Sequence, residues 1–314
     1  MSTAHSGFAA IVGRPNVGKS TLLNRLVGEK IAIVSPKPQT TRTRITGILT
    51  RPEGQVAFVD TPGIHDAKGA LNRAMVEAAT SALDDVDVAL LLVEPALGPD
   101  GKTPEVTPGV RAIIDRLATV RKPVLLVVNK VDTVPKPLLL PFVAALEALR
   151  PFAEVLLVSA LTGDGMEDLI RATLARLPEG PPLFDPETFT DQQEVGLAAE
   201  LIREQVLRHC RQEVPHSAAV VVDAFDESER APRPGSRPGG LQGLVRVHAT
   251  LFVERESQKA IVIGRRGAML KTIGTDARKA LERLLGTHVY LDLRVKVEPR
   301  WTETDRGLRR VGLR

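Results

Sequence analysis

The chain has 314 residues, of which 43% are hydrophobic and 25% charged, ordinary values for a globular protein and enough for two domains. A single cysteine, Cys210, excludes an intramolecular disulfide and favours a reducing compartment, and the first residues lack the pattern of a signal peptide. No apolar run approaches the ~18 residues of a membrane span, so we expect a cytoplasmic protein, with peripheral contact at the inner face of the cell membrane left open.

Apolar runs alternate with helical patterns up to about residue 177, which predicts an α/β domain. We expect a doubly wound, mostly parallel sheet with the ligand at the carboxyl ends of its strands, and one antiparallel pair joined by a turn at 51–54. The expected strands are 7–12, 45–50, 55–60, 87–93, 123–128 and 153–158, and the expected helices are 19–28, 70–82, 105–118, 138–149 and 166–177.

The first expected strand leads into a P-loop, and a helix leaves it. Backbone amides of such a loop form a nest for phosphate oxygens, and the helix dipole adds to their attraction. Lys19 is predicted to contact the β- and γ-phosphates, and the Ser20 hydroxyl to bind Mg²⁺. The residues predicted to surround the phosphates are Gly13, Arg14, Pro15, Asn16, Val17, Gly18, Lys19, Ser20 and Thr21.

Two polar segments are predicted to complete the metal and γ-phosphate site. Asp60 ends the third strand and is expected to hold Mg²⁺ through a water, while the Gly63 amide senses the γ-phosphate. In the stretch 39–42, Thr41 rather than Thr40 is expected to join the metal shell only when triphosphate is bound. The candidate catalytic residues are therefore Lys19, Thr41 and Gly63.

Two later motifs select the base. The Asp132 carboxylate can accept from both guanine N1–H and N2–H₂, a donor edge that adenine lacks. Asn129 suits the N7 side of the base, the Lys130 stem can lie over the ring, and the Ala160 amide is expected to reach guanine O6. The order of the motifs predicts GTP and GDP as ligands. Outside the P-loop, the predicted nucleotide-binding residues are Asp60, Thr61, Pro62, Gly63, Asn129, Lys130, Asp132, Ser159, Ala160 and Leu161.

Beyond a Pro- and Gly-rich break at 177–182 the pattern becomes that of a smaller α+β domain. We expect helices at 192–212, 257–263 and 268–285 and strands at 217–225, 243–254 and 288–298, with an irregular loop at 227–240 to which we assign no role. Trp301 either stacks on RNA or anchors a terminal helix, and we favour the anchor.

A G-x-x-G loop lies between the last two expected helices. In a KH domain such a loop clamps the backbone of about four nucleotides. Residues 255–314 carry 15 Lys and Arg against 7 Asp and Glu, which favours a polyanionic partner. The residues predicted to contact RNA are Ile261, Ile263, Gly264, Arg265, Arg266, Gly267, Lys271 and Ile273.

The first ~180 residues resemble GTPases of the Era/TrmE group, and the rest resembles the RNA-binding domain of the Era family. The resemblance rests on Asn16, on residues 40–42 and on the segment 251–259. One residue departs from the family's pattern, because Ser257 stands where that family usually has glycine. The resemblance implies a Mg²⁺-dependent GTPase domain (1–178), a linker (179–191) and a type II KH domain with a basic tail (192–314). It also implies binding to small-subunit (16S) ribosomal RNA near its 3′ end and a role in assembly of the small ribosomal subunit.

Two positions bear on the rate of hydrolysis. Ile64 stands where Ras-like enzymes carry the glutamine that orients the attacking water, so we expect slow intrinsic hydrolysis. Asn16 either holds a K⁺ ion, as in the resembling GTPases, or only shapes the loop, and both interpretations stay open. A passive RNA-binding protein with a decayed nucleotide site is disfavoured because every nucleotide motif is intact. An ATP-dependent kinase is disfavoured by the guanine-selecting motif at 129–132.

Overall fold

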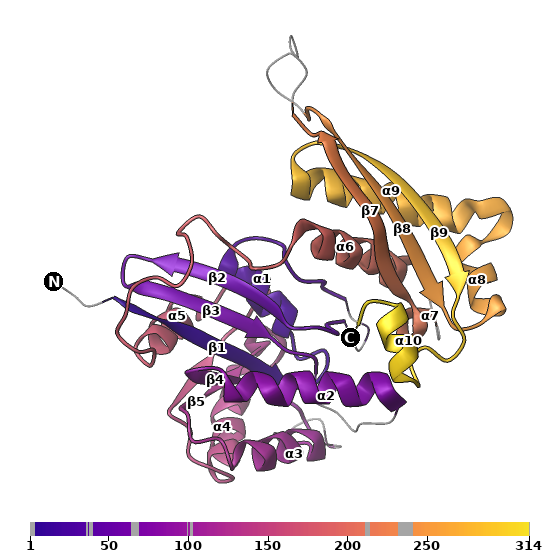
Figure 1. Ribbon diagram of the computed structural model, residues 1–314. Coiled ribbons are helices and arrows are strands. Elements are labelled where there is room, and N and C mark those ends of the chain that lie inside the picture. The colour runs from indigo at the N-terminus through magenta and orange to yellow at the C-terminus, as the bar shows by residue number, and fades with distance from the viewer. Residues whose placement is uncertain are drawn as a thin grey trace. The chain divides into compact units, whose positions relative to one another are not determined.

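The computed structural model describes residues 4–35, 37, 40–63, 69–98, 100, 103–210, 214–231 and 241–313. Contacts divide the chain into two compact units, each with its own sheet (Figure 1). Unit 1 comprises residues up to 191 except 35–38 and 69–71, and unit 2 comprises 192–314 together with those two short segments. Within the described ranges, no helix has both the length and the apolar character that crossing a bilayer requires.

Unit 1 is built on a six-stranded sheet in the order β2-β3-β1-β4-β5-β6. The β2–β3 pair is antiparallel and the other four pairs are parallel, which confirms the predicted α/β sheet with one hairpin. Strands β4 and β5 are buried at every position, and this two-sided burial explains their unbroken apolar sequences. The strands are β1 (His5–Gly13), β2 (Ile45–Arg51), β3 (Gly54–Asp60), β4 (Val88–Val93), β5 (Val124–Val128) and β6 (Glu154–Leu157).

Helices cover both faces of this sheet. Buried residues of α2, α3 and α4 form one core with β1, β4 and β5, while α1 and α5 contact β1 and β3. Helix α3 begins at Pro108 rather than at 105, because Leu97 and Pro104 first form a β-bridge and proline suits a first helical turn. The helices are α1 (Lys19–Val27), α2 (Gly69–Asp84), α3 (Pro108–Leu117), α4 (Leu139–Glu147) and α5 (Met166–Leu174), with 3₁₀ turns at Val131–Thr133 and Lys136–Leu138.

The segment predicted as the linker, 179–191, is held against unit 1. The buried side chain of Gln55 at the start of β3 accepts from the Leu183 amide at 2.8 Å. At the outer edge of the sheet, the Ile48 amide of β2 donates to the Phe189 carbonyl at 2.9 Å. The segment therefore closes the β2 edge and belongs to unit 1 up to residue 191.

Unit 2 is a three-stranded sheet with helices, in the sheet order β7-β8-β9. Strands β7 and β8 are antiparallel, whereas β8 and β9 are parallel and are joined through two helices that flank the G-x-x-G loop. This order confirms the predicted KH arrangement. The elements are α6 (Glu194–His209), α7 (Val214–Ser217), β7 (Ala219–Glu229), β8 (Leu244–Val253), α8 (Glu256–Ile263), a 3₁₀ turn (Arg265–Gly267), α9 (Ala268–Leu285), β9 (His288–Val297) and α10 (Asp305–Arg310).

Several expected boundaries in unit 2 were wrong. Helix α6 ends at His209 rather than 212, and a short helix occupies 214–217, where we expected the strand to begin. Strand β7 continues to Glu229, so the segment expected to be irregular from 227 begins as strand, supported by an ion pair between Glu229 and Arg246 of β8. Residues 232–240 of that segment lie outside the described ranges.

Trp301 anchors the C-terminal segment to unit 2. Its side chain is fully buried, and its Nε1 donates to the Ser217 carbonyl at 2.9 Å. A buried indole with its one donor satisfied has no face left for stacking on RNA. The favoured anchor interpretation is therefore confirmed.

Candidate functional site

The segment between β1 and α1 has the backbone of a phosphate-binding loop. Asn16 and Gly18 adopt positive φ angles of 65° and 100°. A Cβ atom on Gly13 would lie 2.4 Å from the Leu92 carbonyl oxygen, so only glycine fits there. Lys19 Nζ donates to the carbonyls of Gly13 and Arg14 at 3.2 and 3.0 Å, and so spans the loop.

Lys19 is held in a site that disfavours its own charge. Its side chain is buried, and burial lowers its pKa from 10.5 to about 8, against the opposing effect of the Asp60 charge. An ammonium group whose charge is poorly solvated gains more from an anionic partner than one in water. A bound phosphate would therefore stabilise the ammonium form of Lys19 and raise its pKa again.

Three oxygen-bearing side chains from three predicted motifs meet in one place. Ser20 Oγ and Thr41 Oγ1 donate to Asp60 Oδ2 at 2.8 and 2.9 Å, and the two hydroxyl oxygens lie 2.9 Å apart. The other carboxylate oxygen, Asp60 Oδ1, is buried and has no hydrogen-bond partner within the described chain. Burial raises the pKa of Asp60, an effect that the Lys19 charge and the two hydroxyl bonds partly offset.

This cluster fits a Mg²⁺ ion. Magnesium prefers hard oxygen ligands, and here two hydroxyls and an unsatisfied carboxylate oxygen converge beside the phosphate-binding loop. A divalent cation would also remove the electrostatic cost of the buried Asp60 carboxylate. Ser20, Thr41 and Asp60 are the residues that could hold it.

The segment after Asp60 lies against the phosphate loop. A Cβ atom on Gly63 would come within 2.7 Å of the Pro15 nitrogen, so glycine permits this close approach. The buried Thr61 hydroxyl donates to the Ile11 carbonyl at 2.9 Å and fixes the segment to β1. Ile64 and Gln39 lie outside the described residues.

Asn129 joins two parts of the nucleotide site. Its Nδ2 donates to the Val17 carbonyl, and its Oδ1 accepts from the Ala160 amide, both at 2.9 Å. The expected contacts of Asn129 with guanine N7 and of the Ala160 amide with guanine O6 stay predictions. In the structure the two groups bind each other, and Asn129 connects the phosphate loop to the loop after β6.

Lys130 and Asp132, which follow Asn129 in the sequence, differ in their contacts. Lys130 Nζ donates to the Asn16 carbonyl at 2.8 Å and forms an ion pair with Glu94, a residue that the sequence did not indicate. Asp132 lies exposed in the turn after β5 and accepts no hydrogen bond from the described residues. Its carboxylate is therefore available as the acceptor for a base.

A cavity of about 380 Å³ lies between α1 and the loops that follow α1 and β6. Thr21, Ala160 and Leu161, all predicted to bind nucleotide, line it. Asn24 and Arg25 line it as well, although no motif singled them out. The cavity continues the nucleotide site along helix α1.

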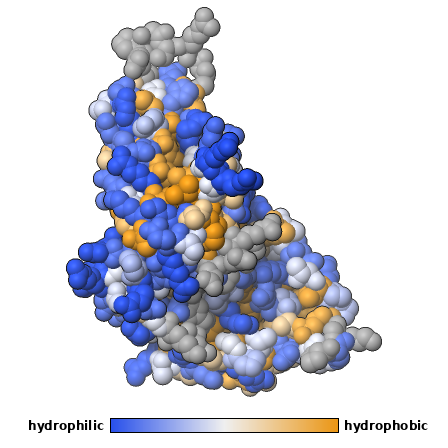
Figure 2. Space-filling view, turned by 90° about the vertical axis from the view of Figure 1, so that its right-hand side faces the viewer, coloured by the Kyte–Doolittle hydropathy of each residue, from blue (hydrophilic) through white to orange (hydrophobic). Residues whose placement is uncertain are grey.

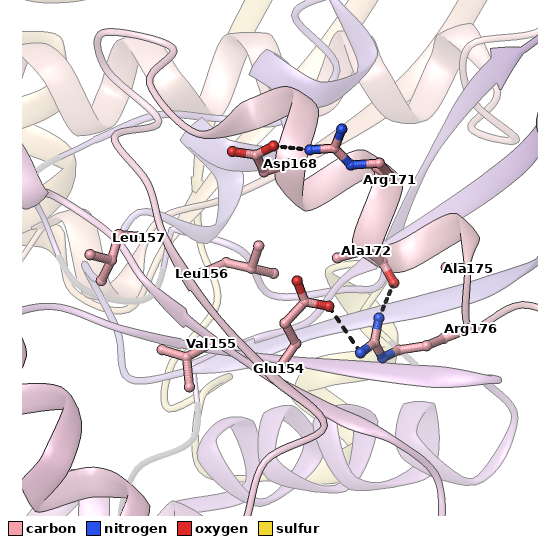
Figure 3. A pocket seen from close by; sticks show the side chains of 9 residues that line it. All are labelled: Glu154, Val155, Leu156, Leu157, Asp168, Arg171, Ala172, Ala175 and Arg176. Atoms are coloured by element: carbon pink, nitrogen blue, oxygen red, sulfur yellow. Dashed lines mark hydrogen bonds and ion pairs between the residues drawn. The ribbon is translucent and has the colours of Figure 1, made fainter.

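A second cavity, of about 500 Å³, lies between β6 and α5 (Figure 3). Its charged residues are paired with each other, Glu154 with Arg176 and Asp168 with Arg171. None of the residues predicted to bind a ligand lines it. We therefore assign it no function.

The G-x-x-G loop of unit 2 forms a tight turn between α8 and α9. Gly264, Arg266 and Gly267 have positive φ angles of 71°, 50° and 78°. A Cβ atom on Gly264 would lie 2.7 Å from Met269 Cβ, so the first glycine is required for this turn. Arg265 and Arg266 are exposed at the tip of this turn. Lys271, one turn into α9, is also exposed.

Apolar residues beside this loop differ in exposure. Ile261 is 46% exposed and Ile263 is partly buried, so both present apolar surface next to the basic tip. Ile273, which we also expected to contact RNA, is fully buried in the core of unit 2, and this prediction is corrected. Figure 2 shows, on unit 2 below the uppermost grey atoms, an apolar strip between hydrophilic side chains.

Two family models match the chain. Residues 8–130 match the model described as 50S ribosome-binding GTPase, and residues 213–302 match the KH domain. The first range falls largely in unit 1, and the second falls entirely in unit 2.

Similar proteins cover the full length. The chain is 49% identical to GTPase Era of Geobacter metallireducens and 50% identical to GTPase Era of Geotalea uraniireducens, in each case over 98% of this chain and 97% of the relative. An Era variant from Aquifex aeolicus with GDP·AlF₄⁻ bound superposes with a TM-score of 0.88 at 37% identity, over 98% of this chain and 99% of that one. Era in complex with MgGDPNP and nucleotides 1506–1542 of 16S ribosomal RNA gives a TM-score of 0.89 at 37% identity, over 99% of both chains.

Proposed function

The chain belongs to the Era family of GTPases, and on this premise we propose that GTP binding and hydrolysis control its attachment to the 3′ end of 16S ribosomal RNA during assembly of the small ribosomal subunit. The catalytic module is a GTPase domain at 1–178, the segment 179–191 links it to the rest, and the RNA-binding module is the KH domain with its basic tail at 192–314. We place the protein in the cytoplasm, and we propose peripheral attachment to the inner face of the cell membrane.

In this proposal each residue of the phosphate site has one task. Lys19 neutralises charge on the β- and γ-phosphates, and the amides of the phosphate loop bind the remaining oxygens. Ser20, Thr41 and Asp60 hold Mg²⁺, which supplies positive charge to the phosphates when bound. Thr41 takes part only with triphosphate, and the Gly63 amide meets the γ-phosphate, so these two residues report which nucleotide is present.

The residues that select the base differ from the residue that could bind a monovalent cation. Asp132 reads the guanine donor edge, while Asn129 and Lys130 brace the loops around the base. Asn16 either contributes to a K⁺ site beside the phosphates or only shapes the loop; its positive φ and the Lys130 bond to its carbonyl agree with both. Equal hydrolysis rates in K⁺ and Na⁺ at matched ionic strength would exclude the K⁺ site.

In the KH domain, the G-x-x-G loop meets the RNA backbone. Arg265 and Arg266 bind phosphates, and the exposed edge of Ile261 with Ile263 packs on bases in the adjoining groove. Lys271 adds a further positive charge at the start of α9. Two observations support this assignment. The exposed arginines lie at a turn for which Gly264 is required. A relative has been solved in complex with nucleotides of 16S ribosomal RNA.

The observation that carries the proposal is the meeting of Ser20, Thr41 and Asp60, because it connects the phosphate loop to both segments that can sense triphosphate. The test is to titrate the full chain, with a GTP analogue and Mg²⁺, into a fluorescent RNA of the 16S 3′ end and into a scrambled RNA of equal length. Preference for the 3′-end sequence supports the proposal. Equal affinities for the two RNAs would contradict it.

A further inference from the structure

The segment that follows helix α1 is fastened to that helix by one side chain, Asn24. Its Oδ1 accepts from the amides of Ile31 and Ala32 at 3.0 and 2.9 Å, and its Nδ2 donates to the Ala32 carbonyl at 2.9 Å. Ile31 and Ala32 are each only 3% exposed, so water is a poor alternative partner for these backbone groups. Asn24 therefore sets where the segment leading to Thr41 begins.

The far end of the same segment lies in the metal cluster. Thr41 Oγ1 donates to Asp60 Oδ2 and lies 2.9 Å from Ser20 Oγ, and Ser20 belongs to the first turn of α1. One helix thus contacts both ends of the stretch from Ile31 to Thr41. We propose that Asn24 is a positioning residue for the triphosphate-dependent step, because it holds the start of this stretch where Thr41 can reach the metal.

The physical basis is the entropy of ordering. With Asn24 in place, residues 31 and 32 are already fixed before nucleotide binds. Without it, triphosphate has to order these residues in addition to recruiting Thr41, whereas diphosphate does not recruit Thr41 and avoids this cost. Loss of Asn24 should therefore weaken triphosphate binding more than diphosphate binding. The inference rests on the role proposed for Thr41.

The next residue along the helix offers a matched contrast. Arg25 Nε and Nη2 donate to the carbonyls of Ala160 and Leu161 at 3.2 and 2.5 Å. Arg25 therefore holds the loop beside the base, which GTP and GDP share. Removing its guanidinium should weaken both nucleotides to the same extent.

The experiment compares Asn24→Ala, Asn24→Asp and Arg25→Met in the full chain. Equilibrium affinities for GDP and for a non-hydrolysable GTP analogue are measured with Mg²⁺, and hydrogen exchange reports on the amides of residues 31 and 32. We expect Asn24→Ala to lower the ratio of GTP-analogue to GDP affinity roughly tenfold, the effect of about one net hydrogen bond, and to speed exchange at both amides. Arg25→Met should leave the ratio and this exchange unchanged.

Thr41→Ala and Asn24→Asp distinguish a failure of the role proposed for Asn24 from a failure of the role of Thr41 and from misfolding. Thr41→Ala should also lower the ratio; if it does so while Asn24→Ala does not, the positioning role of Asn24 is wrong. If Thr41→Ala leaves the ratio unchanged, the assignment of Thr41 itself is wrong, and the inference falls with it. Should Asn24→Ala fail to bind GDP through misfolding, Asn24→Asp decides, because it keeps an acceptor for the amides of Ile31 and Ala32 but loses the donor to the Ala32 carbonyl. A fall of about threefold supports the proposal, and no change overturns it.

Discussion

Asp132→Asn gives the sharpest test of guanine selection. The carboxylate is exposed in the turn at 131–133 and accepts no hydrogen bond from the described residues, so the substitution should not affect folding. It replaces an acceptor for two guanine donors by an amide that can accept only one. Hydrogen bonds to a charged group contribute about 1.5–3 kcal/mol each. The substitution removes one of these bonds and removes the charge from the other, so the lower value taken twice gives an upper bound of about 3 kcal/mol, or roughly a hundredfold in affinity.

The assay is an equilibrium titration with GDP, a GTP analogue and the corresponding xanthosine nucleotides, accompanied by thermal melting. We expect GDP and GTP affinities to fall by the same factor, because both nucleotides carry the same base. Xanthine presents a carbonyl where guanine has its amino group, so the amide of the variant can donate to it. The preference should therefore shift towards xanthosine triphosphate.

Asp115→Asn is a suitable control, because Asp115 is likewise an exposed carboxylate but lies on α3. This control should retain the affinities of the unsubstituted protein. Unchanged GDP affinity in Asp132→Asn, with an unchanged melting temperature, would refute the assignment of Asp132 to the base.

Three further predictions concern other parts of the molecule. Lys19→Ala should lower turnover by at least about a hundredfold without lowering the melting temperature, because burial already disfavours the Lys19 charge; retained hydrolysis would contradict the phosphate assignment. Replacing Arg265 and Arg266 together by alanine should reduce the salt dependence of RNA binding by up to about two phosphate contacts while GDP affinity stays constant, and an unchanged salt slope would remove these residues from the interface. Trp301→Ala should destabilise unit 2 by about 3–5 kcal/mol, as for other buried aromatic residues, and denaturant unfolding that shows less than 1 kcal/mol would contradict its anchoring role.

The sequence predicts those residues of the nucleotide site that lie at or after the carboxyl ends of the strands, because these ends meet at one edge of a parallel sheet. Asp60 is the last residue of β3, and Ser20 lies in the first turn of α1, the helix that follows β1. Because β1 and β3 are adjacent parallel strands, the meeting of Ser20 and Asp60 follows from sheet topology. Asn24 and Arg25 could not be found in this way. They act through hydrogen bonds to backbone groups of distant loops, and backbone partners leave no pattern in the sequence.

Ile273 shows a different limit. Its apolar side chain next to the G-x-x-G loop suggested a contact with bases, yet it shares the buried face of α9 with Ala277, Ala280 and Leu281. The spacing of these residues is that of one helical face, and this periodicity would have placed Ile273 in the core. By contrast, the extension of β7 to Glu229 depends on cross-strand pairing with β8, which local composition does not reveal.

The central claim is that nucleotide state controls attachment to ribosomal RNA. It is tested most directly by measuring the affinity of the full chain for an RNA of the 16S 3′ end, once with a GTP analogue and once with GDP, at one salt concentration. Because coupling is reciprocal, the RNA should also change the ratio of GTP-analogue to GDP affinity by the same factor. We expect a difference in RNA affinity between the two states that is matched by this reciprocal shift. Identical RNA affinities in the two states would show two linked but independent modules and would contradict the account.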